Sequence, residues 1–104
     1  MHTIVKGSLS WESLKEAVVS NIPSVFFNGL SRDLSQLWIY KNKFSVSMKL
    51  PDSGFHIVGD YIKHSDSFIL KIIREGKENE LFKKFEHSLV SQLSISRNFS
   101  IDEQ

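Results

Sequence analysis

The stretch FSVSMKL at residues 44–50 decides the fold class of this chain. Its four apolar residues alternate with two serines and a lysine, so an extended strand here has one apolar side and one polar side. The sequence PDSG follows at residues 51–54, where proline presets φ and glycine permits a left-handed backbone. A half-buried strand that runs into a tight turn predicts an antiparallel neighbour.

Further segments of β type lie on both sides of this strand and are separated by short polar turns. Such a series predicts an antiparallel meander, which we expect to contain about four to five strands. The segments of this meander are residues 37–40, 55–62 and 68–74, and residues 3–9 predict a further short strand or an extended lead-in.

Two amphipathic segments flank these strands. Apolar residues recur at spacings of three and four in residues 11–21, after the capping residue Ser10 and before Pro23. Residues 78–94 carry a similar stripe of phenylalanine and leucine. We therefore predict an α+β fold of one domain, residues 1–96, with both helices packed on one face of the sheet and a polar tail at 97–104. The predicted core consists of Trp11, Leu14, Val18, Ile22, Phe44, Val46, Met48, Leu50, Phe68, Leu70, Ile72, Phe82, Phe85, Leu89 and Leu93.

Composition excludes several classes of protein. The 104 residues include 13 Lys and Arg, 12 Asp and Glu and no Cys, for a formal net charge of +1. A chain without cysteine has no disulfide, no thiolate metal site and no cysteine nucleophile. It also lacks the run of about 20 apolar residues that a membrane span needs, so no membrane association is expected. Because no secretory signal is visible, the expected compartment is the cytoplasm, or the nucleus in a eukaryotic host.

Catalytic motifs are absent from the sequence. It contains neither a glycine-rich phosphate loop, nor a Gly-x-Ser-x-Gly elbow, nor a His-Glu-x-x-His pair. The densest polar group is His56, Asp60, His64 and Asp66, in which two imidazoles and two carboxylates are chemically suited to a metal or to acid–base work. Such residues beside a hairpin turn more often face solvent and cap the turn. We therefore predict no catalytic residue, no metal and no cofactor, and a non-enzymatic protein.

One strand is apolar on both faces. In residues 68–74, Ile69 and Ile73 lie opposite the predicted core side, and only Lys71 interrupts them. If both helices cover one face, the other needs a cover, which a curled sheet, another protein or a second copy would supply. The leading hypothesis is a regulatory or interaction protein that binds a partner or itself as a homodimer through this face. Its candidate residues are Ile69, Ile73, Trp38 and Tyr40.

Lysines in the sheet region support a second hypothesis, in which the chain binds nucleic acid. Lysines supply phosphate contacts, and the neighbouring aromatic residues Trp38 and Tyr40 are suited to stack on bases. A net charge of only +1 and interleaved aspartates weigh against this hypothesis. Its candidate residues are Lys41, Lys43, Lys49, Lys63 and Lys71.

Overall fold

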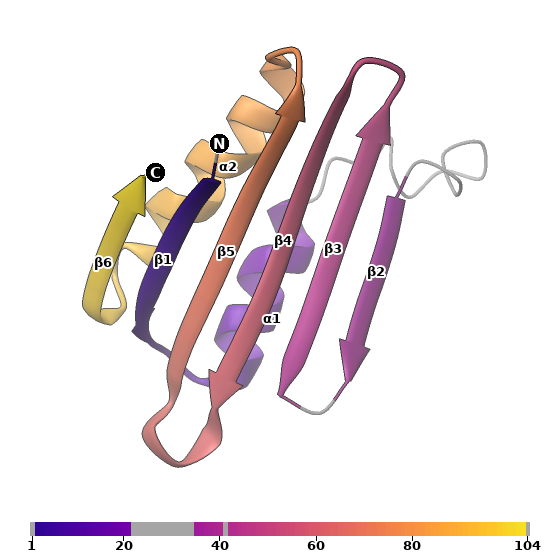
Figure 1. Ribbon diagram of the computed structural model, residues 1–104. Coiled ribbons are helices and arrows are strands. Elements are labelled where there is room, and N and C mark those ends of the chain that lie inside the picture. The colour runs from indigo at the N-terminus through magenta and orange to yellow at the C-terminus, as the bar shows by residue number, and fades with distance from the viewer. Residues whose placement is uncertain (1, 22–34, 41, 104) are drawn as a thin grey trace.

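The computed structural model describes residues 2–21, 35–40 and 42–103, and of residues 35–40 it describes the backbone only. Within these ranges six strands and two α-helices follow one another along the chain (Figure 1). A 3₁₀ turn at Lys63–Ser65 joins the fourth strand to the fifth. The elements are β1 (His2–Ser8), α1 (Trp11–Asn21), β2 (Ser35–Tyr40), β3 (Lys43–Leu50), β4 (Ser53–Ile62), β5 (Ser67–Gly76), α2 (Glu80–Leu93) and β6 (Arg97–Glu103).

The described strands form one sheet in the order β2-β3-β4-β5-β1-β6, and every neighbouring pair is antiparallel. Strands β2 to β5 form the predicted meander. The first strand of the chain then lies beside β5, and the last strand lies beside the first (Figure 1). The prediction of an α+β fold with an antiparallel sheet and two helices is confirmed.

The C-terminal end differs from the prediction. Residues 97–104 were expected to be a polar tail, but Arg97–Glu103 pairs with β1 and brings the described strands to six rather than four or five. Strand β6 has one neighbour and is mostly exposed, and its apolar alternation is limited to Phe99 and Ile101, which is too short to identify a half-buried strand. The second helix is also shorter than the expected 78–94. It begins at Glu80, because the side chain of Asn79 accepts a hydrogen bond from the Leu81 amide and caps it.

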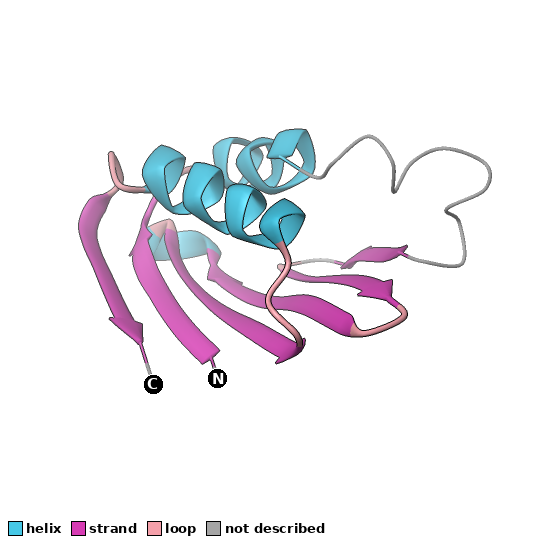
Figure 2. Ribbon diagram, turned by 90° about the horizontal axis from the view of Figure 1, so that it is seen from above, coloured by secondary structure: helices cyan, strands magenta, loops and turns pink. Residues whose placement is uncertain are grey.

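Helices α1 and α2 lie on the same side of the sheet in Figure 2. Ring contacts join each helix to β4. The Trp11 ring of α1 lies 5.3 Å from that of Tyr61, and the Phe55 ring lies 5.6 Å and 5.3 Å from the rings of Phe82 and Phe85 in α2. Both helices therefore pack against β4, α1 at Tyr61 and α2 at Phe55.

The buried core contains most of the residues that the sequence predicts. Trp11 and Leu50 are only partly buried against it, and Ile22 lies outside the described residues. The prediction missed five members of the core. Three of them lie in the segment 55–62, which carries apolar residues on both faces, so its pattern alone does not show which face is buried. The missed residues are Val5, Ala17, Phe55, Ile57 and Tyr61.

Candidate interaction surface on the open face of the sheet

The face of the sheet opposite α1 and α2 has no described helix against it (Figure 2). Burial alternates along each strand, so the residues between buried neighbours point to this side. We call this side the open face. Its described side chains include Ile4 and Lys6 from β1, Lys43, Ser45, Ser47 and Lys49 from β3, His56, Val58 and Asp60 from β4, and Ile69, Lys71, Ile73 and Glu75 from β5.

Four aliphatic side chains gather at the middle of the open face. The strand register pairs Val58 with Lys71 and Lys71 with Ile4, while Ile69 and Ile73 are two residues either side of Lys71 along β5. Val58 is 48% exposed and Ile69 is 43% exposed, while Ile4 and Ile73 are half-buried. We call Ile4, Val58, Ile69 and Ile73 the apolar patch.

Two predicted interface residues lie on β2, at the edge of the sheet. The backbone register pairs Trp38 with Ser45 and Tyr40 with Lys43. Their side chains are outside the described part of the structure, so their role in an interface stays a prediction. The two interface residues of β5, Ile69 and Ile73, are both in the apolar patch.

The candidate lysines separate into three groups. Lys43, Lys49 and Lys71 are exposed on the open face. Lys63 is in the 3₁₀ turn beyond β4, and Lys41 lies outside the described residues. Because carboxylates also lie on this face, and Lys43 is 3.6 Å from one of them, that of Asp60, the described open face has mixed charge.

A chain of polar contacts crosses three strands at the border of the apolar patch. The Oγ of Ser47 lies 2.7 Å from Nδ1 of His56, and Nε2 of the same ring lies 3.4 Å from Oε2 of Glu75. The order serine–histidine–carboxylate is that of a hydrolase triad. A triad also needs free amides to stabilise an oxyanion, whereas the backbone around Ser47 is paired in the sheet on both sides. The contacts orient the His56 ring, and the backbone amides beside Ser47 are taken up by the sheet.

The predicted His and Asp group does not come together. His56 contacts Ser47 and Glu75, and Asp60 pairs with Lys43, while His64 is an exposed residue of the 3₁₀ turn. Within residues 2–21, 35–40 and 42–103, no cluster of three or more His, Cys, Asp or Glu side chains is arranged to hold a metal ion.

Asp66 instead accepts a hydrogen bond from the phenol of Tyr61. The Tyr61 hydroxyl lies 2.7 Å from the Asp66 carboxylate and 2.7 Å from the Leu9 carbonyl oxygen. Burial, together with the hydrogen bond and the negative charge of Asp66, raises the pKa of Tyr61 to about 12. Asp66 itself has a φ of 51°, so it also forms the left-handed end of the turn before β5. These contacts tie the β4–β5 turn to the connection between β1 and α1.

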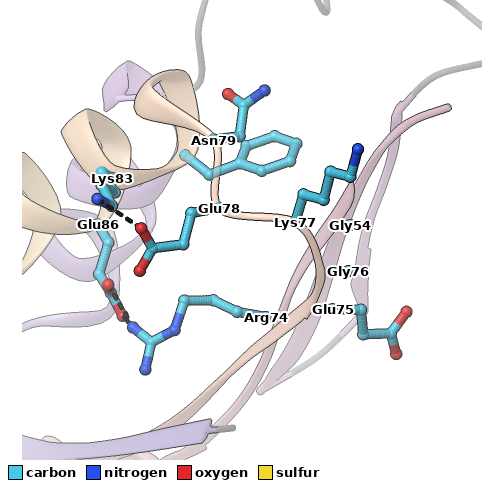
Figure 3. Close-up of a pocket in the computed structure, with 10 residues that line it drawn as sticks. Gly54, Arg74, Glu75, Gly76, Lys77, Glu78, Asn79, Lys83 and Glu86 are labelled. Atoms are coloured by element: carbon cyan, nitrogen blue, oxygen red, sulfur yellow. Dashed lines mark hydrogen bonds and ion pairs between the residues drawn. The ribbon is translucent and has the colours of Figure 1, made fainter. Parts of the chain in front are cut away.

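A cavity of about 460 Å³ opens where β5 ends and α2 begins (Figure 3). Four of its charged side chains form two pairs: Arg74 forms an ion pair with Glu86, and Lys83 lies 3.0 Å from Glu78. Arg74 also donates a hydrogen bond to Thr3 in β1, at 3.1 Å. This network fastens α2 to the sheet, and its balanced charge does not favour a ligand of either sign.

Comparison of the chain with protein-family models and with curated proteins finds no match. None of the helices in the described parts of the chain is long and apolar enough to cross a membrane. Function is therefore inferred from the open face itself.

Proposed function

We propose that this chain is a non-enzymatic interaction protein that docks a partner protein on the apolar patch. The observation that supports this proposal is the position of the patch. Val58 and Ile69 are nearly half exposed although they lie on β4 and β5, the two central strands of the sheet. Contiguous exposed aliphatic residues at the centre of a sheet are typical of an interaction surface.

The patch alone supplies a modest binding energy. Burying the remaining exposed part of each aliphatic side chain gains about 1 kcal/mol, so four side chains gain roughly 4 kcal/mol. Association itself costs about 4–15 kcal/mol in lost translational and rotational freedom. A partner must therefore also make polar contacts with the rim of the patch, where Ser47, His56 and Lys6 offer hydrogen-bonding groups.

Nucleic-acid binding is the second candidate function. It is favoured by the presence of Lys43, Lys49 and Lys71 on one face. It is disfavoured because Asp60 neutralises Lys43 and the centre of the face is aliphatic, which gives phosphates few free cations and bases no described aromatic surface.

A capture experiment separates these functions. Tagged wild-type protein, the double variant Ile69→Glu/Ile73→Glu and the single variant Ile95→Glu are each used to capture partners from nuclease-treated native lysate. Ile95 is a matched control, because it is 82% exposed and follows α2, away from the open face. The proposal expects a stoichiometric partner with wild type and Ile95→Glu, and its loss with the double variant.

Three other outcomes contradict the proposal. Capture that is unchanged by the double variant would place binding elsewhere on the molecule. Partners that disappear on nuclease treatment, with affinity that falls steeply with salt and with Lys49→Glu, would identify a nucleic-acid surface. A concentration-dependent dimer in sedimentation velocity that the double variant abolishes would show that the patch binds a second copy. Far-ultraviolet circular dichroism of each variant verifies that it remains folded.

A further inference from the structure

Lys71 occupies the centre of the apolar patch. Its cross-strand neighbours are Val58 on β4 and Ile4 on β1, and its neighbours along β5 are Ile69 and Ile73. Directly opposed side chains of an antiparallel sheet are about 5 Å apart at Cβ, and residues two apart on a strand are separated by about 7 Å. All four nearest side chains on this face are therefore aliphatic.

The charge of Lys71 has no counterpart on the described part of the protein. Two other cations have a carboxylate partner: Lys43 lies 3.6 Å from Asp60, and Arg74 forms an ion pair with Glu86. Among the described residues, no carboxylate lies within ion-pair distance of Lys71. The nearest carboxylate by register is that of Asp60, which is opposite Ile69 and so diagonal to Lys71 at about 7–8 Å, and it pairs with Lys43. Asp102 lies two strands away beyond Ile4, at about 10 Å.

Docking an apolar surface on the patch removes the Lys71 ammonium from water. An ammonium group that is buried without a counter-charge is strongly destabilising, whereas one that meets a carboxylate with good geometry recovers much of the desolvation cost. The complementary surface is therefore apolar with a carboxylate at its centre.

A second copy of this chain does not provide such a surface. Stacking one patch directly on another brings two Lys71 side chains together, and like charges repel most strongly where water is excluded. The described carboxylates of the open face lie at the border of the patch and not at its centre: Asp60 is opposite Ile69, and Glu75 is two residues beyond Ile73 on β5. The charge pattern thus favours a different protein over a homodimer.

We propose that Lys71 selects the partner, and that the partner presents an amphipathic helix whose apolar face carries an aspartate or glutamate near its middle. This inference rests on the proposed function, because it assumes that the apolar patch is the docking surface. A helix fits the patch in size, since it is about 10–12 Å wide and the patch spans the three strands β4, β5 and β1.

Selection from a peptide library tests the proposal without a known partner. The probe is a phage-displayed library of amphipathic 18-residue helices in which two positions at the centre of the apolar face are randomised. It is panned against wild type, Lys71→Glu, Lys71→Met and the control Lys49→Glu, which changes an exposed lysine of the same face outside the patch. Binders that Ile69→Glu also retains are discarded, because they do not use the patch.

The proposal expects acidic residues at the central positions with wild type and Lys49→Glu. Lys71→Glu should select lysine or arginine there, and Lys71→Met should select neither charge. A synthetic peptide with the selected glutamate should bind wild type at least tenfold more tightly than its glutamine analogue, with a preference that weakens as salt is added.

Two results overturn the inference in distinguishable ways. In the first, wild type, Lys71→Glu and Lys71→Met all select the same uncharged sequences. That result would show that the patch binds helices but that the charge at position 71 does not determine which helices bind. The proposed function would then stand. Failure of wild type to enrich any helix over Ile69→Glu would overturn the inference and count against the patch as a docking surface.

Discussion

Replacing Gly59 with alanine tests how closely the sheet packs beneath α1. The strand register places Gly59 between Phe44 on β3 and Leu70 on β5. A Cβ atom at this position would lie 2.5 Å from both Cε1 and Cζ of Phe44 and 3.0 Å from Cδ2 of Leu70. The Phe44 ring is 3% exposed, and its centroid is 5.9 Å from that of Trp11, so it has little room to withdraw.

The size of the effect follows from these distances. The ring must move by about 1 Å to restore ordinary contact, and overpacking of this kind costs about 1–3 kcal/mol. Alanine regains about 0.5–1 kcal/mol because glycine loses more backbone entropy on folding. We therefore expect the free energy of unfolding of Gly59→Ala to fall by about 1–2 kcal/mol, which lowers the melting temperature by roughly 5–10 °C in a domain of this size.

Urea denaturation followed by circular dichroism measures this change, and a double-mutant cycle identifies its cause. Phe44→Leu removes the ring that the new methyl group would meet, so the cost of Gly59→Ala should be smaller in the Phe44→Leu background by at least 0.5 kcal/mol, on the order of typical coupling between contacting residues. A Gly59→Ala protein as stable as wild type, or a cycle without coupling, would refute the packing described for this site.

Three further predictions concern the helices and the turns. Phe85→Ala should lower the free energy of unfolding by about 3–5 kcal/mol, because the ring is buried at 2% exposure, and a loss under about 1 kcal/mol would contradict the described face of α2. Glu86→Gln should cost about 1–2 kcal/mol in thermal denaturation, because it removes the counter-charge of the partly buried Arg74, and an unchanged melting temperature would argue against this ion pair. Between pH 10 and about 12, folded Tyr61 keeps its phenolic proton while the unfolded chain loses it. The contribution of Tyr61 to the free energy of unfolding should therefore be fully present below pH 10 and should be lost as pH rises toward 12. Tyr61→Phe should lack this loss, and parallel pH dependences of the two proteins would disprove it.

Under the proposed function, Lys71 restricts which surfaces can dock on the apolar patch. An aliphatic surface on central strands favours docking, but a lone cation within it makes docking of a purely apolar surface unfavourable. The Lys71→Met variant is informative for this reason. It should lose charge selectivity while retaining the apolar contacts of Ile69 and Val58.

Much of the secondary structure could be predicted from the sequence, because its signals are local. Helix α1 spans the predicted residues 11–21, and the alternation of residues 44–50 matches a strand with one buried side. These periods of 3.6 and 2 depend only on neighbouring residues along the chain. The period of 2 also showed that β5 carries apolar residues on both faces. From that pattern Ile69 and Ile73 were predicted to lie on the face opposite the core.

Only the tertiary structure decided where the first and last strands join the sheet. Strand β6 pairs with β1 although the paired residues, from Ser8 with Arg97 to Thr3 with Glu103, are far apart in the sequence, and its mostly polar sequence does not indicate that partner. The pairing of β1 with β5 also joins distant segments, and it places Ile4 beside Lys71. The registers of β3 with β4 and of β4 with β5 bring His56 to Ser47 and Glu75 rather than to the predicted aspartates. Periodicity shows which side of a strand is apolar, but the partners of each side chain depend on strand order and register, which arise from contacts between residues distant in sequence.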